Sequence, residues 1–130
     1  MHIMYGVRKE LSERRIMTNP CLMKYCKGLY SLMYMTEETQ QSAICEASRV
    51  LKAGGTMHIW DCDIGSAFPD PFVVDLDIRS GDKRIRTSYG IVKADAQSSD
   101  SVIRLLEQAG LGIIFLKENN EQFHIQCRKE

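Results

Sequence analysis

The stretch Tyr34–Asp61 has the pattern of a strand, a helix and a second strand, and it constrains the fold of this 130-residue chain more than any other stretch. Thr36 is a suitable N-cap, and Glu37 and Glu38 place negative charge at the positive end of the helix dipole. The helix is predicted to end at Gly54–Gly55, because glycine adopts a positive φ without a steric clash. Three- and four-residue spacings predict one buried helix face, made of Ala43, Ile44, Ala47, Val50 and Leu51.

Two strands are predicted to flank this helix in parallel. Leu29–Met35 is almost continuously apolar, which is typical of a central strand that is covered on both faces. Thr56–Trp60 is rich in β-prone residues and leads to the acidic end Asp61-Cys62-Asp63. Met33 and Met35 are interpreted as core residues, and the helix is expected to form a right-handed crossover between the two strands.

The rest of the chain adds further elements. Alternating apolar residues on both sides of Ser80-Gly81-Asp82 predict a β-hairpin, which is interpreted as a lid, a dimer surface or structural decoration. Ser98 or Ser99 is predicted to cap a helix that ends at Gly110. The remaining predicted elements are a strand at Met1–Gly6, a helix at Val7–Met17, and two antiparallel strands at Gly112–Glu118 and Gln122–Arg128. Together they predict an α/β fold with a mixed sheet and helices on its faces.

One run of residues resembles a known family. Glu46-Ala47-Ser48-Arg49-Val50-Leu51-Lys52-Ala53-Gly54-Gly55 is similar to the E-A-x-R-V-L-K-P-G-G run between the fourth and fifth strands of class I S-adenosylmethionine-dependent methyltransferases, and most similar to the methyltransferase type 11 group. The resemblance implies a partial Rossmann-like methyltransferase fold with an added β-hairpin. It also implies that residues 1–130 form one domain that corresponds to the C-terminal part of such an enzyme.

The resemblance implies S-adenosylmethionine as the cofactor, with an incomplete site. The family's G-x-G loop has no counterpart before Leu29, and Val7-Arg8 stands where the family has the acid that binds the cofactor ribose. The expected affinity of the chain for the cofactor is therefore weak or absent.

The ligand site of an open α/β sheet lies outside the carboxyl ends of its parallel strands. Asp61 is the predicted catalytic residue, because its carboxylate can orient an acceptor atom or take up its proton. The alternative is that Asp61 caps the loop after its strand. The residues predicted to surround it at the mouth of the substrate or cofactor site are Tyr34, Met35, Thr36, Trp60, Cys62 and Asp63.

Composition narrows the classes of partner and location. The 17 basic residues balance the 17 acidic residues, so neither a nucleic acid nor a membrane is expected as a partner. No signal peptide or membrane-spanning run is recognised, and the five cysteines form no C-x-x-C pair, so reduced thiols and a cytoplasmic location are expected. No metal site is predicted, because His58 and Asp61 in one strand point to opposite faces.

Three functions remain open at this point. The first is an S-adenosylmethionine-dependent methyltransferase-like protein, truncated or degenerate, that acts on a small-molecule substrate. The second is a non-catalytic interaction module that keeps the methyltransferase sheet without its cofactor. The third is a binder of small molecules unrelated to methyl transfer. The absence of the family's first strand leaves the apolar Leu29–Met35 strand at a sheet edge that needs a cover. Either Met1–Gly6 folds back as a replacement strand, joined by the Val7–Met17 helix, or the same edge of a second molecule pairs with it, and the homodimer is the favoured prediction.

Overall fold

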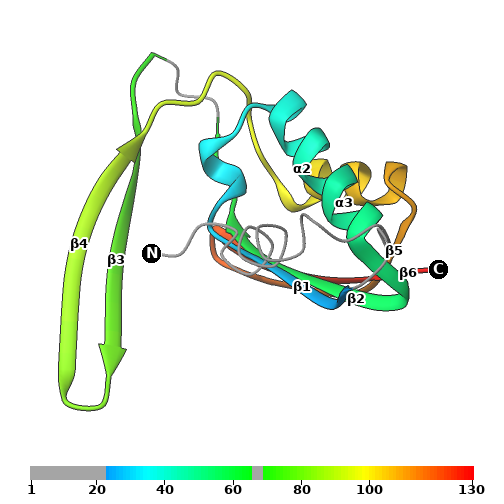
Figure 1. Ribbon diagram of the computed structural model, residues 1–130. Coiled ribbons are helices and arrows are strands. Elements are labelled where there is room, and N and C mark those ends of the chain that lie inside the picture. The colour runs from blue at the N-terminus through cyan, green and yellow to red at the C-terminus, as the bar shows by residue number, and fades with distance from the viewer. Residues whose placement is uncertain (1–22, 66–68) are drawn as a thin grey trace, which may run out of the picture.

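The computed structural model describes residues 23–65 and 69–130, which form a four-stranded mixed sheet, two α-helices and a β-hairpin (Figure 1). The predicted strand Met1–Gly6 and helix Val7–Met17 lie outside the described residues. In chain order the elements are β1 (Met23–Leu29), η1 (Leu32–Tyr34), α2 (Glu37–Val50), β2 (Leu51–Cys62), β3 (Phe72–Ser80), β4 (Lys83–Ile91), α3 (Ser99–Gln108), β5 (Leu111–Asn119) and β6 (Gln122–Lys129).

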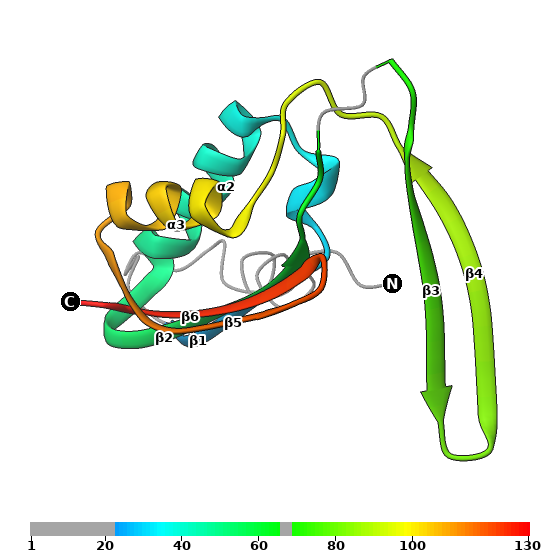
Figure 2. The ribbon, with the colours of Figure 1, turned by 180° about the vertical axis from the view of Figure 1, so that it is seen from behind.

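The sheet has the order β1-β2-β6-β5, with β1 parallel to β2 and β6 antiparallel to both of its neighbours. Figures 1 and 2 show both α2 and α3 on the same face of this sheet. The predicted α/β class, with a mixed sheet and an added hairpin, is confirmed. The helices cover one face only among the described residues, whereas the sequence predicted helices on both.

The prediction of a strand at Leu29–Met35 is wrong. The strand is β1, which lies six residues earlier, and the apolar run after Leu29 forms the short 3-10 helix η1. In β1, Met23, Cys26 and Gly28 are buried, while Lys24 and Tyr25 are exposed. Leu32 and Met33 are apolar because they are buried in the turn that follows the strand, with relative exposures of 1% and 0%.

Helix α2 begins where the sequence predicted and ends earlier. The Thr36 hydroxyl oxygen accepts a hydrogen bond of 3.2 Å from the backbone N–H of Thr39, so the predicted N-cap is confirmed. The helix ends at Val50, because Leu51 is already extended with φ −73° and ψ 139°. Gly54 has the predicted positive φ, 79°, but it lies within β2.

The main core lies between the helices and the covered face of the sheet. It contains sixteen buried residues: Met23, Cys26, Leu32, Ile44, Ala47, Val50, Leu51, Met57, Ile59, Val102, Leu105, Leu106, Leu111, Phe123, Ile125 and Cys127. The predicted buried helix face is therefore confirmed for Ile44, Ala47 and Val50, with Ala43 partly buried against the core. Leu51 is buried too, but it belongs to β2 and not to the helix. Each large side chain buried here stabilises the fold by about 1.5–3 kcal/mol.

The C-terminal elements follow the predictions closely. Ser98 caps α3 in a capping box, in which its hydroxyl accepts from the Ser101 N–H and the Ser101 hydroxyl accepts from the Ser98 N–H. Gly110 follows the helix with φ 85°. Strands β5 and β6 pair antiparallel through a turn in which Asn120 has φ 57°.

The predicted hairpin is confirmed as β3 and β4, with Gly81 at φ 59° in its turn. It extends away from the sheet (Figures 1 and 2). Among residues 23–65 and 69–130, the hairpin packs against the domain at its base, in a second cluster of Met33, Cys62, Ile64 and Ile91 that Tyr30, Phe72, Val74 and Tyr89 border. The hairpin therefore stands beside the carboxyl ends of β1 and β2.

Candidate functional site

The centre of the strand-end region is the buried carboxylate of Asp61, which has a relative exposure of 0%. Its Oδ2 accepts a hydrogen bond of 2.9 Å from the backbone N–H of Leu32. Its Oδ1 accepts from the Cys62 N–H and from the Gln97 side-chain amide, both at 2.9 Å. The carboxylate thus joins the end of β2 to the turn after β1.

Two glutamines complete a buried polar network around this acid. Gln97 Nε2 also donates to the Cys62 carbonyl at 2.8 Å, and Gln97 Oε1 accepts from Gln40 Nε2 at 2.6 Å. Gln40 Nε2 in turn donates to the Leu32 carbonyl at 2.9 Å. A buried network of this kind rigidifies its surroundings when every member has a partner.

Sequence reasoning missed both glutamines. The buried helix face predicted from the sequence does not include Gln40, but Gln40 has a relative exposure of only 3%. The available signal was its position four residues before the buried Ile44, which puts both on one helix face. Gln97 carries no comparable signal, because it enters the network through its antiparallel bridge with Ile64.

Burial raises the pKa of Asp61 to about 6, although the hydrogen bonds from Cys62, Gln97, Leu32 and Met33 lower it. The same burial, together with the nearby Asp61, raises the pKa of the Cys62 thiol to about 12. A thiol with such a pKa is protonated at neutral pH, so Cys62 is a poor nucleophile.

The structure brings three of the predicted mouth residues to the base of the hairpin. Cys62 Sγ lies 3.6 Å from Met33 Sδ in the second cluster. The Tyr34 ring stacks on Tyr89 of β4 at a centroid distance of 6.1 Å, and the Met35 carbonyl accepts a hydrogen bond from Lys93 Nζ. These contacts connect the turn after β1 to β4 and to the segment that follows it.

The other three mouth residues point elsewhere. Thr36 caps α2, and Asp63 Oδ1 accepts a hydrogen bond of 3.2 Å from the Ser99 N–H at the start of α3. The Trp60 ring lies on the sheet face opposite Asp61, where it stacks on His124 at 4.3 Å. The seven predicted site residues therefore surround the strand ends without converging on one point.

Beside these residues lies a cleft of about 230 Å³ between the hairpin base and the β5–β6 turn. Its lining residues are Cys62, Phe72, Val73, Val74, Asp75, Glu121 and Gln122. A small-molecule site occupies roughly 300–1,000 Å³, so this cleft is slightly below that range.

Comparison with known proteins gives a match of fold and not of sequence. No family model and no curated protein matches the chain. Among solved structures, a protein from Pyrococcus horikoshii OT3 is 12% identical with a TM-score of 0.60, over 95% of this chain and 67% of that one. An S-adenosylmethionine-dependent methyltransferase from Clostridium acetobutylicum ATCC 824 is 10% identical with a TM-score of 0.57, over 94% of this chain and 69% of that one.

A third match is the glycopeptide N-methyltransferase MtfA, solved with S-adenosylmethionine, at 10% identity and a TM-score of 0.52. It covers 84% of this chain, and this chain covers 58% of it. The chain has a methyltransferase-type fold. Further complexes of MtfA contain S-adenosylhomocysteine and sinefungin. At these identities the likeness shows the fold alone.

Within this methyltransferase-type fold, the run Glu46–Gly55 forms the last turn of α2 and the first residues of β2, whereas the resemblance placed the whole run between two strands. Of the described residues at the strand ends, some suit a site for S-adenosylmethionine and others do not. Ser31 Oγ, two residues after the end of β1, is buried without a hydrogen-bond partner among the described residues, as a group that faces a ligand can be. Asp61 is not placed to bind a ribose, because its side chain has no exposed surface and both of its oxygens accept protein N–H groups.

Neither α2 nor α3 is long and apolar enough to cross a membrane, and the described residues contain no other helix that is.

Proposed function

We propose that this chain is a methyltransferase-like binding module that does not hold S-adenosylmethionine tightly on its own. The observation that carries this proposal is the engagement of Asp61. The Asp61 carboxylate, at the carboxyl end of β2, has no exposed surface and accepts hydrogen bonds from three protein N–H groups at 2.9 Å. Its geometry is that of a group that holds two loops together, which is the non-catalytic role that the sequence left open.

Calorimetric titration with S-adenosylmethionine and S-adenosylhomocysteine tests this proposal. We expect no saturable heat at micromolar ligand, because the contacts of a glycine loop and a ribose-binding acid are missing. Saturation at one cofactor per chain with a micromolar or lower Kd contradicts it.

A second candidate is methyl transfer to a small-molecule substrate, with Asp61 as the proton acceptor. Two observations favour it: the unpartnered hydroxyl of Ser31 and the pKa of Asp61 near 6, which is close to that of a working general base. For this candidate, Asp61→Asn abolishes turnover while Asp82→Asn, at an exposed site in the hairpin turn, keeps the wild-type rate. Equal rates for wild type and Asp61→Asn remove Asp61 from the reaction.

Assembly belongs to the same proposal. β1 lies at the edge of the sheet, and no described strand pairs with its outer side. The predicted homodimer therefore pairs two β1 edges across a twofold axis rather than two Leu29–Met35 segments. Sedimentation at micromolar concentration checks this, and a monomer at every concentration contradicts it.

A cytoplasmic location completes the proposal. The described cysteines Cys26, Cys45, Cys62 and Cys127 are all free, which is the usual state in a reducing compartment. Localisation of a tagged chain in cells tests this point, and its accumulation outside the cytoplasm contradicts it.

A further inference from the structure

The sheet face opposite α2 and α3 carries a row of aromatic and imidazole rings that crosses all four strands. Paired residues in adjacent strands lie on the same face. His58 pairs with Lys27 and Gln126, and Trp60 pairs with His124, so their side chains share the face that the described helices leave open. The ring contacts run from Tyr25 to His58, then through Trp60 and His124 to Phe115, with centroid distances of 4.3–5.5 Å.

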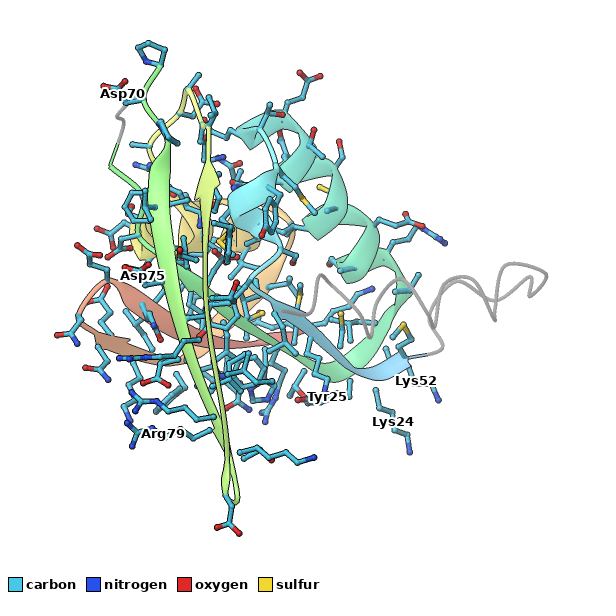
Figure 3. The ribbon with its side chains drawn as sticks, turned by 90° about the vertical axis from the view of Figure 1, so that its left-hand side faces the viewer. Lys24, Tyr25, Lys52, Asp70, Asp75 and Arg79 are labelled. Carbon is cyan, nitrogen blue, oxygen red and sulfur yellow. The ribbon has the colours of Figure 1, made fainter. Side chains whose placement is uncertain are left out.

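The rings are accessible at both ends of the row. Tyr25 on β1 has a relative exposure of 48% and Phe115 on β5 has 44%. Figure 3 shows Lys24 and Tyr25 on the side of β1 away from α2. Because strands are about 4.8 Å apart, the row is roughly 15 Å long. The row is therefore longer than a single nucleobase, and two or three consecutive bases of a nucleic-acid strand can lie along it.

A pocket of about 250 Å³ adjoins this row, and it provides a seat for one planar ring. Its lining combines aromatic rings, a cation and amides: Tyr30, Trp60, Lys117, Asn119, Gln122, Phe123 and His124. Tyr30 has the left-handed backbone angle φ 50°, and its hydroxyl donates to Gln122 Oε1 at 3.3 Å. Non-glycine residues in this strained conformation are concentrated at functional sites.

Three cations and one acid of the described residues lie on this face; the acid is Glu130, whose carboxylate lies beside Gly112, the residue that pairs with Arg128. Lys117 pairs with His124 and Arg128 pairs with Thr56, which places both cations on the same face as the rings, together with Lys27. None of these three cations forms an ion pair with another described residue. Glu118, next to Lys117, lies on the covered face, where its carboxylate accepts a hydrogen bond from the Ser99 hydroxyl, and Glu121 lines the cleft at the hairpin base.

We propose that this open face binds a short stretch of single-stranded nucleic acid. One base stacks against Trp60 in the pocket, neighbouring bases follow the ring row, and Lys27, Lys117 and Arg128 contact phosphates. Base stacking on aromatic side chains contributes about 1–3 kcal/mol per base and tolerates every base. Backbone cations add a salt-dependent term. A sheet with exposed rings and two helices behind it is a known geometry for reading unpaired bases.

Balanced net charge made a nucleic acid an unexpected partner at the level of the sequence. In the fold, Lys27, Lys117 and Arg128 lie on one face of the sheet, and Glu130 is the acid beside them, at the Arg128 end. An apolar protein surface fits the face less well, since burial of three unpaired cations against it is costly. The proposal does not depend on the absence of cofactor binding, because the open face and the Asp61 network lie on opposite sides of β2.

The single tryptophan of the chain provides a direct test, because Trp60 is part of the proposed site. Tryptophan fluorescence is titrated with single-stranded oligouridylate and oligothymidylate at low salt. We expect saturable quenching and an affinity that falls steeply with salt. The double variant Lys117→Gln/Arg128→Gln is expected to bind at least tenfold more weakly, with a salt slope reduced by about 2.

The matched control is Lys83→Gln/Arg86→Gln, which removes two cations from the hairpin and is expected to keep the wild-type affinity. Circular dichroism confirms that both variants fold. Three results overturn the proposal: no saturable quenching at low salt, equal affinity of the Lys117/Arg128 variant and wild type, or equal affinity for uridine monophosphate and the oligonucleotides. A fluorescence change on dilution of the protein alone also overturns it, because a second copy then covers the face.

Discussion

The Asp61 carboxylate lies 2.9 Å from the backbone N–H of Leu32, 29 residues earlier in the chain, and this contact ties the end of β2 to the turn after β1. Asp61 was predicted from its position after a β-prone run. Its partners come from the turn before α2 and from the residue before the α3 cap. The sequence therefore identifies Asp61 as a residue at the strand ends. It does not identify the role of Asp61, because that role depends on hydrogen bonds to residues far away in the chain.

Removal of this acceptor is expected to destabilise the fold. Asp61→Ala leaves the N–H groups of Leu32 and Cys62 and the Gln97 amide buried without their acceptor. An unsatisfied buried donor costs about 1–3 kcal/mol, so we expect a loss of about 2–4 kcal/mol in the free energy of unfolding. Urea denaturation measures it. Asp82→Ala, at an exposed site in the hairpin turn, serves as control, and equal losses for the two variants contradict this role of Asp61.

The pH dependence of stability follows from the raised pKa of Asp61. Its folded pKa of about 6 exceeds the ordinary 3.8, so the folded state binds more protons between these values. Stability from this group therefore increases as pH falls from about 6 to about 4, by up to about 3 kcal/mol.

The measurement is the difference in unfolding free energy between wild type and Asp61→Asn at a series of pH values. We expect this difference to shift in favour of wild type as the pH falls through that window. A difference that stays constant from pH 7 to pH 4 shows that Asp61 titrates normally.

The positions of the helices were predictable because their signals are local. Thr36 and Ser98 are capping residues whose partners lie three residues away, at Thr39 and Ser101. The position of β1 was not predictable in this way. Its alternating pattern reflects a sheet with one face that the described helices leave uncovered, whereas the continuous run at Leu29–Met35 reflects burial in a turn. Apolar content alone does not distinguish these two environments.

Gly55, in the run that resembles the methyltransferase family, lies where the backbone leaves no room for a side chain. A Cβ on Gly55 meets the Lys52 carbonyl oxygen at 2.8 Å and the Met23 carbonyl oxygen at 3.2 Å, so the backbone must shift to accommodate it. We expect Gly55→Ala to lower the free energy of unfolding by about 1–3 kcal/mol. Gly65→Ala is the matched control, because a Cβ there meets nothing within 4 Å. Thermal unfolding of both variants checks this, and equal melting temperatures contradict it.

The hairpin is expected to be the least protected part of the described structure. Its base is packed through Phe72, Val74 and Tyr89, but Ile78 and Ile85 near the tip have relative exposures of 42% and 59%. A two-stranded hairpin without a third strand is only marginally stable in water. Hydrogen exchange should therefore be fast at the tip and slow in β2 and β6. Equal protection from hydrogen exchange at the hairpin tip and in β2 contradicts this expectation and indicates that another surface covers the hairpin.

The central claim is that the strand ends are structural and do not hold a cofactor in this chain. The most direct measurement is the ¹H–¹⁵N NMR spectrum of labelled protein with and without millimolar S-adenosylmethionine. The Leu32 and Cys62 amides report on it, because both donate to Asp61. We predict that their resonances do not move. Saturable shifts of both resonances, with Ser31 shifting at the same ligand concentration, contradict the account.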